Sequence, residues 1–517
     1  MDIYKFEEID QTPQTRYDKF YCNKEMNRNF DESIISRGNS NIDRSKYNNP
    51  YNDILFLIQW FSNQTDSPMD VIKSLSITIE SCIDEVSSII LETNFIPFLL
   101  HAVVETPSSQ VELKTSLVRL IWKMLGNFKS LRFTFFREGL LPIATNFFQN
   151  DSIITVRIYS IFSIIYLFQS FGYTNRSDFE KYITITMLLN TYNQLNENIN
   201  KRMMQEKMRK NRLQLLKGII NLASRISYYP LTRDESNSAF RLSYICLVEP
   251  LYREKKSDKD WAKHCYTFAL QTLSYVIENG CMNFNDFFEL KMFDIIARRL
   301  KSATPSHRIL SCDIFLALFE KKYFMDNKHV FDVGINDLLQ YIDDFKEERG
   351  AYIRLLSSII RNDQINGFYI NQFFYSEQKN SKGIKTICHY LLHEGNFEVT
   401  ASSAHCLIEL FRKLTPDMVR ESLEIVNASN KLPMEINLLD SLVKIIQFGL
   451  DDDIELSVFA LEIIYNLIEF TRKDDTYDTF YDILSKSTDG FELFLDLSQN
   501  DDQRIRFLSE RIQNTLQ

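Results

Sequence analysis

One order of parts recurs along this chain: an apolar helix, a short acidic or polar break, and a second, longer amphipathic helix. It is clearest in residues 381–414 and returns in residues 94–128, 138–168 and 437–470. A pair of amphipathic helices cannot bury both of its faces alone, so such pairs must stack on one another. The recurrence therefore predicts an all-α fold, a right-handed α-solenoid superhelix whose concave groove holds another macromolecule.

The composition supports this expectation. There are only 13 Gly and 11 Pro among 517 residues, too few to supply the frequent turns of a sheet protein. The chain is also longer than one compact core usually allows, whereas the core of a stacked repeat grows linearly with repeat number. We expect a helical content well above half.

The spacing of equivalent positions is close to that of known helical repeats. Phe95 and Leu140 are 45 residues apart, and Ile384, Leu438 and Phe491 follow at intervals of 54 and 53. The first interval is typical of armadillo or HEAT repeats, and the longer ones indicate insertions in loops. The last unit carries more charge on its final helix, as a terminal cap requires.

The sequence divides into a polar arm and a repeat region. Residues 1–50 are rich in Asn, Asp, Arg and Ser without helical periodicity, which predicts a disordered arm. The repeat region is expected over 51–517, with irregular loops near 194–212, 228–260 and 363–382. The basic stretch 201–212 is either a binding site for an acidic partner or lipid headgroup, or the solvated start of a helix.

Charge and cysteine usage limit the environment and the partners. A net charge of −10 argues against a protein that coats nucleic acid. The eight cysteines form no CxxC pair, and we interpret them as reduced, buried thiols. The N-terminus shows no secretory signal, so a cytoplasmic location is expected, with the nucleus as an alternative. The apolar run 152–168 is short for a membrane span and contains Arg157, which predicts a buried helix and no transmembrane segment.

Residues 51–517 resemble the armadillo family, most clearly in the four segments above. In that family a Gly often occupies the turn before the second helix, as Gly139 and Gly383 would here, and the third helix ends near L-x-N-L-A. Similar endings are IINLAS (219–224), IIYNLIEF (463–470) and KMLGNF (123–128). The resemblance implies that Asn127, Asn221 and Asn466 hold the backbone of an extended peptide in the groove.

Helical periodicity places these asparagines on polar stripes opposite the apolar faces of their helices. An amide can pair with both groups of a peptide unit, because it is both donor and acceptor. The alternative is that these are ordinary solvated positions. The stripes predict a groove that is basic towards the N-terminus and acidic towards the C-terminus. The candidate binding residues are Arg119, Lys123, Asn127, Lys217, Asn221, Arg225, Glu462 and Asn466.

The resemblance favours a non-catalytic adaptor or scaffold that binds a protein or peptide. An importin-α-like transport adaptor is one alternative, but that subfamily has Trp four residues before the Asn, where this chain has Lys123, Lys217 and Glu462. A regulatory subunit of a phosphatase or kinase is another. The oligomeric state is left open.

The sequence shows no recognisable catalytic set or nucleotide-binding loop, so we expect neither an enzyme nor a cofactor. His389 and His393 lie one turn apart and could chelate zinc, but Tyr390 occupies the position where a zinc protease has Glu. We therefore expect no metal. The acidic runs 451–453 and 501–502 are interpreted as helix N-termini, which carboxylates stabilise.

Overall fold

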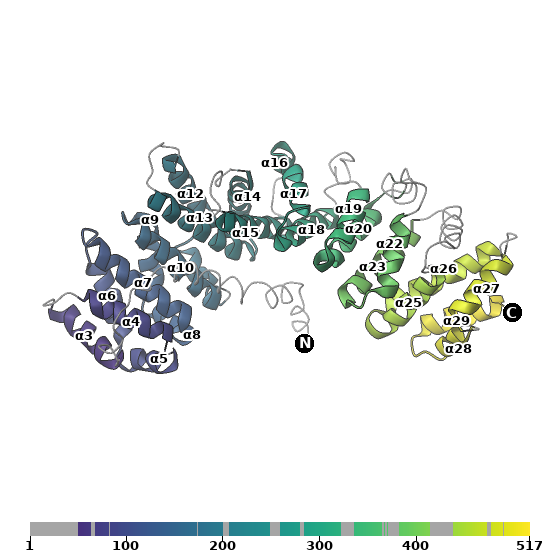
Figure 1. Cartoon of the computed structure of the whole chain (residues 1–517), viewed down its shortest axis with the longest axis horizontal. Helices are drawn as coiled ribbons and strands as arrows, with labels where there is room; N and C mark the ends of the chain where they lie inside the picture. Colours follow the sequence, from purple (N-terminus) through teal and green to yellow (C-terminus); the bar gives the residue numbers. More distant parts are fainter. Residues whose placement is uncertain are drawn as a thin grey trace, which may run out of the picture. The chain divides into compact units, whose positions relative to one another are not determined.

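The computed structural model describes residues 50–63, 68–81, 83–172, 174–199, 206–248, 259–279, 284–321, 335–363, 367, 370, 382–413, 438–472, 477–489 and 491–516. Every regular element in these ranges is helical, which confirms the all-α prediction. The chain forms two compact units, residues 1–138 and 139–517, which are described separately (Figure 1). The predicted arm, residues 1–50, lies outside the described residues except for Pro50.

The described residues of the first unit form six helices that pack on one another in chain order. They are α3 (Pro50–Asn63), α4 (Met69–Ser81), α5 (Ile83–Glu92), α6 (Phe95–Glu105), α7 (Val111–Asn127) and α8 (Lys129–Arg137). α3 contacts α4, α5 and α6, while α7 packs against α4, α6 and α8. Fully buried side chains such as Leu57, Phe95 and Leu117 form its core.

The second unit is built from two rows of helices. The first row comprises α9 (Leu140–Asn150), α12 (Ile185–Ile199), α14 (Arg233–Val248), α17 (Met292–Leu300), α19 (Ile335–Asp344), α22 (Lys382–His393), α25 (Leu438–Asp452) and α28 (Glu492–Leu497). The second row comprises α10 (Ile154–Phe171), α13 (Glu206–Ser227), α15 (Lys259–Glu278), α18 (Pro305–Glu320), α20 (Arg349–Asn362), α23 (Phe397–Phe411), α26 (Ile454–Thr471) and α29 (Gln503–Leu516).

Each second-row helix packs on its first-row partner and on the neighbouring members of its own row. Figure 1 shows this sequential arrangement, in which helices close in the chain are close in space. The second row is therefore covered by the first row on one side and by its own neighbours on two others. A stripe on the remaining side of each helix is left accessible.

Additional helices precede three of these pairs, namely α11 (Arg176–Glu180), α16 (Phe284–Glu289) and α27 (Tyr477–Ser487), and the 3-10 helix η4 (Lys346–Glu348) lies between α19 and α20. Four helices, α6, α9, α17 and α28, are each preceded by a residue in the left-handed conformation. These residues are Asn94, Gly139, Lys291 and Phe491, with φ between 51° and 86°. Because the same turn recurs, Phe95 and Leu140 are equivalent positions, as their spacing predicts. Only one of these four residues is glycine.

The prediction that Gly383 occupies such a turn is wrong. It is the second residue of α22 and is buried. Glycine alone was a poor marker, because four described residues with side chains take the left-handed conformation elsewhere in the chain.

A recurring hydrogen bond closes the turn between the two helices of a pair. The donor is the side chain at the fourth position of the second helix, and the acceptor is a carbonyl in the last two turns of the preceding helix or just after it. The pairs are Arg157 to Phe148 (2.8 Å), Arg308 to Ser302 (2.6 Å), Thr400 to Glu394 (3.2 Å) and Ser457 to Ile446 (2.7 Å).

The predicted loop over 228–260 is wrong for its central part, which forms α14. The helix starts with a capping box: the Glu235 N–H donates to Thr232 Oγ1 (3.3 Å), and the Thr232 N–H donates to Glu235 Oε2 (3.1 Å). The loop predicted over 194–212 is likewise helical at both ends, in α12 and α13. Most of the loop predicted over 363–382 lies outside the described residues.

α10 is the one helix in the described ranges that is long and apolar enough by itself to cross a bilayer. In the structure it packs against α9 and α13, and ten of its residues are buried. A Cβ added to Gly218 on α13 would lie 2.7 Å from Ile161 Cγ2, so glycine permits the close approach of α13 to α10. α10 is thus a core helix of the second unit, as predicted.

Candidate functional site

The accessible stripe is clearest on α26, where Glu455, Phe459, Glu462 and Asn466 are spaced by four, three and four residues. Glu462 and Asn466, both predicted binding residues, are exposed. Within the described part of the chain, neither side chain has a hydrogen-bond or ion-pair partner. The role of these two residues in binding stays a prediction.

Side chains from neighbouring helices flank this stripe. Arg412 of α23 stacks on Phe459, with Cζ 3.7 Å from the ring centroid. On the other side, Arg511 of α29 stacks on Tyr465 at 4.2 Å and donates to its hydroxyl at 2.9 Å. Phe507, 57% exposed, lies beside Arg511. We call the surface formed by Arg412, Phe459, Glu462, Tyr465, Asn466, Phe507 and Arg511 the ladder face.

Phe459 corrects the sequence reading in one respect. Helical periodicity places an apolar residue at this position in the core, but Phe459 is half-buried and is covered by an arginine. Arg412, Tyr465, Phe507 and Arg511 were likewise not singled out as site residues. No pattern within a single helix marks them, because only the packing of three helices brings them to one surface.

Ion pairs continue across the second row before the ladder face. Glu409 is nearly buried and accepts from Arg412 (3.0 Å) and Arg361 (3.1 Å). At the other end of α26, Glu455 pairs with Arg504 of α29 at 2.6 Å. Arg412, which follows α23, and the arginines of α29 thus border the carboxylates of α26, so the charge at the predicted acidic end is mixed.

The predicted residues on α13 are less accessible than expected. Lys217 is only 6% exposed, because its side chain lies where α13 packs between α10 and α15. Burial lowers the pKa of Lys217 to about 8. Asn221 and Arg225 are half-buried, and the Arg225 Nε donates to Asn221 Oδ1 at 2.9 Å. The expectation that Lys217 is solvated is wrong.

In the first unit, Lys123 is 8% exposed, and its Nζ donates to the Ser76 carbonyl at 3.4 Å. The expectation of a solvated lysine is wrong here too, since α4 covers it. Asn127 is exposed, and its Nδ2 donates to the Lys123 carbonyl at 3.0 Å. Arg119 is half-buried.

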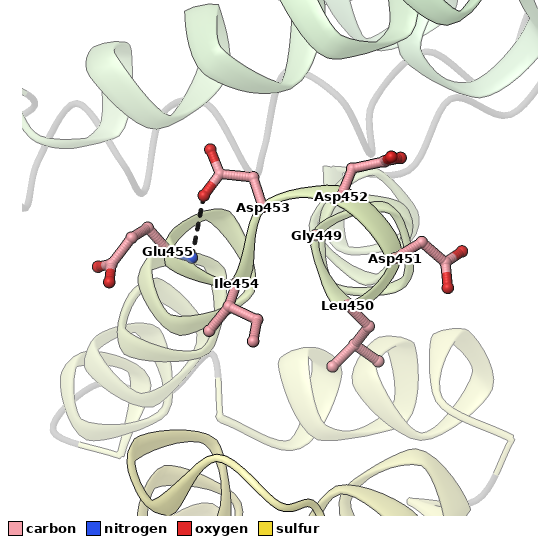
Figure 2. A pocket seen from close by; sticks show the side chains of 7 residues that line it. All are labelled: Gly449, Leu450, Asp451, Asp452, Asp453, Ile454 and Glu455. Carbon is pink, nitrogen blue, oxygen red and sulfur yellow. Dashed lines mark hydrogen bonds between the residues drawn. The ribbon is translucent and has the colours of Figure 1, made fainter. Parts of the chain in front are cut away.

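A shallow pocket of about 360 Å³ lies at the turn between α25 and α26. Figure 2 shows its acidic side chains directed away from Leu450 and Ile454, with Asp453 bonded to the Glu455 N–H at 3.2 Å. Asp502 accepts from the Arg504 N–H at 2.8 Å in the same way before α29. Both acidic runs mark helix N-termini, as predicted.

The histidine–cysteine segment of α22 is a packed helix surface. The rings of His389 and His393 lie 5.1 Å apart, and Cys388 is fully buried, which raises the pKa of its thiol to about 12. Cys406 on α23 is also buried. Among the described residues, no three His, Cys, Asp or Glu side chains come together as a metal site.

Comparison with known proteins gives information on the fold alone. No family model matches the chain, and no curated protein matches it. Among solved structures, the chain is similar to an engineered protein determined by the Northeast Structural Genomics Consortium. The likeness has a TM-score of 0.57 at 12% identity and covers 90% of this chain and 98% of the other. The chain is thus an all-helical, repeat-like protein.

Proposed function

We propose that this protein is a non-catalytic adaptor with an armadillo-like solenoid fold, and that a segment of a partner protein binds across the ladder face. The observation that carries the proposal is the combination of exposed Phe507, the two stacked arginines, and the unengaged Glu462 and Asn466 on one surface.

The residue types of the ladder face favour protein recognition. Aromatic residues and arginine are enriched in protein interfaces and among their energetically dominant residues. Stacking on Phe459 and Tyr465 orients the guanidinium groups of Arg412 and Arg511 before any partner arrives. Such preorganisation lowers the entropic cost of binding.

The polar residues suit an extended segment. The Asn466 amide can donate to and accept from the backbone of a partner, and the Glu462 carboxylate can pair with a basic side chain. These contacts would bind a peptide with little dependence on its sequence. The adjacent arginines would recognise acidic or aromatic side chains next to it.

Site-specific cross-linking tests the proposal. A photoreactive residue replaces Asn466 in one variant and Lys444, exposed on α25 in the first row, in the control. We expect the Asn466 variant to form a defined cross-link to a partner protein, and the additional changes Arg412→Ala and Arg511→Ala to abolish it. Equal capture from both positions, or capture unaffected by the two changes, contradicts the proposal.

The identity of the captured protein then separates the alternatives. An importin-β-type receptor would support nuclear transport, and a catalytic subunit would support regulation of a phosphatase or kinase. A protein of another class would support the scaffold.

A further inference from the structure

A second polar cluster lies on α13, α15 and α18, which are separated from α26 in the second row by α20 and α23. Ser224 of α13 bonds to Gln271 of α15 across the helix interface at 3.5 Å, which fixes the register of the two helices. Lys217 and His264 each precede these residues by seven positions, which is about two helical turns. Lys217 and His264 therefore face each other across the same interface.

A third helix adds to this cluster. His307 of α18 is 3% exposed, and its Nε2 lies 2.9 Å from the Lys263 carbonyl and 3.1 Å from Thr267 Oγ1. Its Nδ1 lies 3.3 Å from Ser302 Oγ. These contacts anchor α18 against the turn of α15 that carries Lys263 and His264.

Burial lowers the pKa of His264 to about 4, and the nearby Lys217, Lys263 and His307 act in the same direction. Burial also lowers the pKa of His307, as do the charges of Arg299, which stacks on Tyr266 at 4.2 Å, and Lys263, while the hydrogen bond to the Lys263 carbonyl raises it. His264 is consequently neutral at pH 7 and has an N–H to donate, while Lys217, with its pKa of about 8, is cationic.

The cluster is partly accessible to solvent, because His264 and Asn221 are half-buried and Lys263 is exposed. Asn221 follows Lys217 by one turn and presents an amide to the same stripe. A buried ammonium group beside half-buried N–H donors suits the binding of a negatively charged group.

We propose that Lys217, Lys263 and His264, with Asn221 beside them, bind an oxyanion, either a phosphate or a carboxylate group. The ligand would interact with the Lys217 ammonium group and accept an N–H from His264. This inference concerns a surface apart from the ladder face and does not depend on the proposed adaptor function.

The test uses the full chain and inorganic phosphate as the probe, compared with chloride at equal ionic strength and pH 7. We expect phosphate to raise the melting temperature of the wild type and to move the imidazole resonances of His264 in NMR spectra. Lys217→Met and His264→Gln should each abolish the excess stabilisation. Lys385→Met, a half-buried lysine on α22, serves as the matched control and should retain it.

The outcomes are decisive in either direction. If acetate has the same effect as phosphate, the site accepts carboxylates; if phosphate alone acts, it is a phosphate site. A melting temperature that does not distinguish phosphate from chloride, or an equal response of wild type and both cluster variants, overturns the proposal. His264→Gln preserves size and polarity, so it remains informative if Lys217→Met fails to fold.

Discussion

Replacing Lys217 by Met should stabilise the second unit, although the change removes a charged side chain from a position that sequence periodicity had assigned to the solvated stripe. Met matches the length and aliphatic character of lysine without its ammonium group. In the folded state, burial lowers the pKa of Lys217 from 10.5 to about 8. The unfolded chain retains the ordinary value, so the folded state binds the proton less tightly.

The magnitude follows from this difference. One pKa unit corresponds to about 1.4 kcal/mol, so the charged lysine costs the folded state about 3 kcal/mol at pH 7. Because the folded pKa is the lower one, the unfolded state binds more protons between pH 8 and 10.5. The free energy of unfolding of the wild type therefore rises with pH in that window. Lys217→Met should be about 3 kcal/mol more stable at pH 7 and about 1 kcal/mol more stable at pH 10.

Urea denaturation followed by circular dichroism at both pH values measures the difference. The buffer contains chloride and no phosphate, so that binding at the proposed oxyanion site does not mask the cost. The difference between the free energies of unfolding of variant and wild type cancels the contributions of other lysines and tyrosines that titrate in the same range. A variant that is less stable at pH 7, or a difference that stays constant between pH 7 and 10, would refute the reasoning.

Three further substitutions test the packing. Gly218→Ala should destabilise by about 1–3 kcal/mol in urea melts, because the new methyl group would lie 2.7 Å from Ile161 Cγ2, whereas Ala at an exposed helix site would stabilise. Thr232→Ala should cost about 0.5–2 kcal/mol and speed hydrogen exchange at the start of α14, through loss of the capping box; uniform exchange changes along the chain would argue against that cause. Leu407→Ala should cost about 2–5 kcal/mol, since Leu407 is fully buried, and an unchanged denaturation midpoint would show that the site relaxes around the cavity.

The sequence alone determined the all-helical class, because periodic apolar positions and scarce Gly and Pro are local properties of the chain. It also located the recurring helix pairs, and its acidic runs correctly marked the starts of α26 and α29. The capping box at Thr232 and Glu235 was readable in principle as T-x-x-E, but the polar residues after it obscured the helix.

Only the tertiary structure decided which polar positions are exposed. Periodicity separates two sides of one helix, yet a helix of the stack also contacts helices that lie far from it in the chain. Lys123, where α7 meets α4, and Lys217, where α13 meets α10 and α15, are buried at such contacts, whereas Asn466, on a stripe with the same spacing, is exposed. The ladder face also depends on packing between helices. Its arginines stack on its aromatic rings because of the register between α23, α26 and α29, which no pattern within a single helix determines.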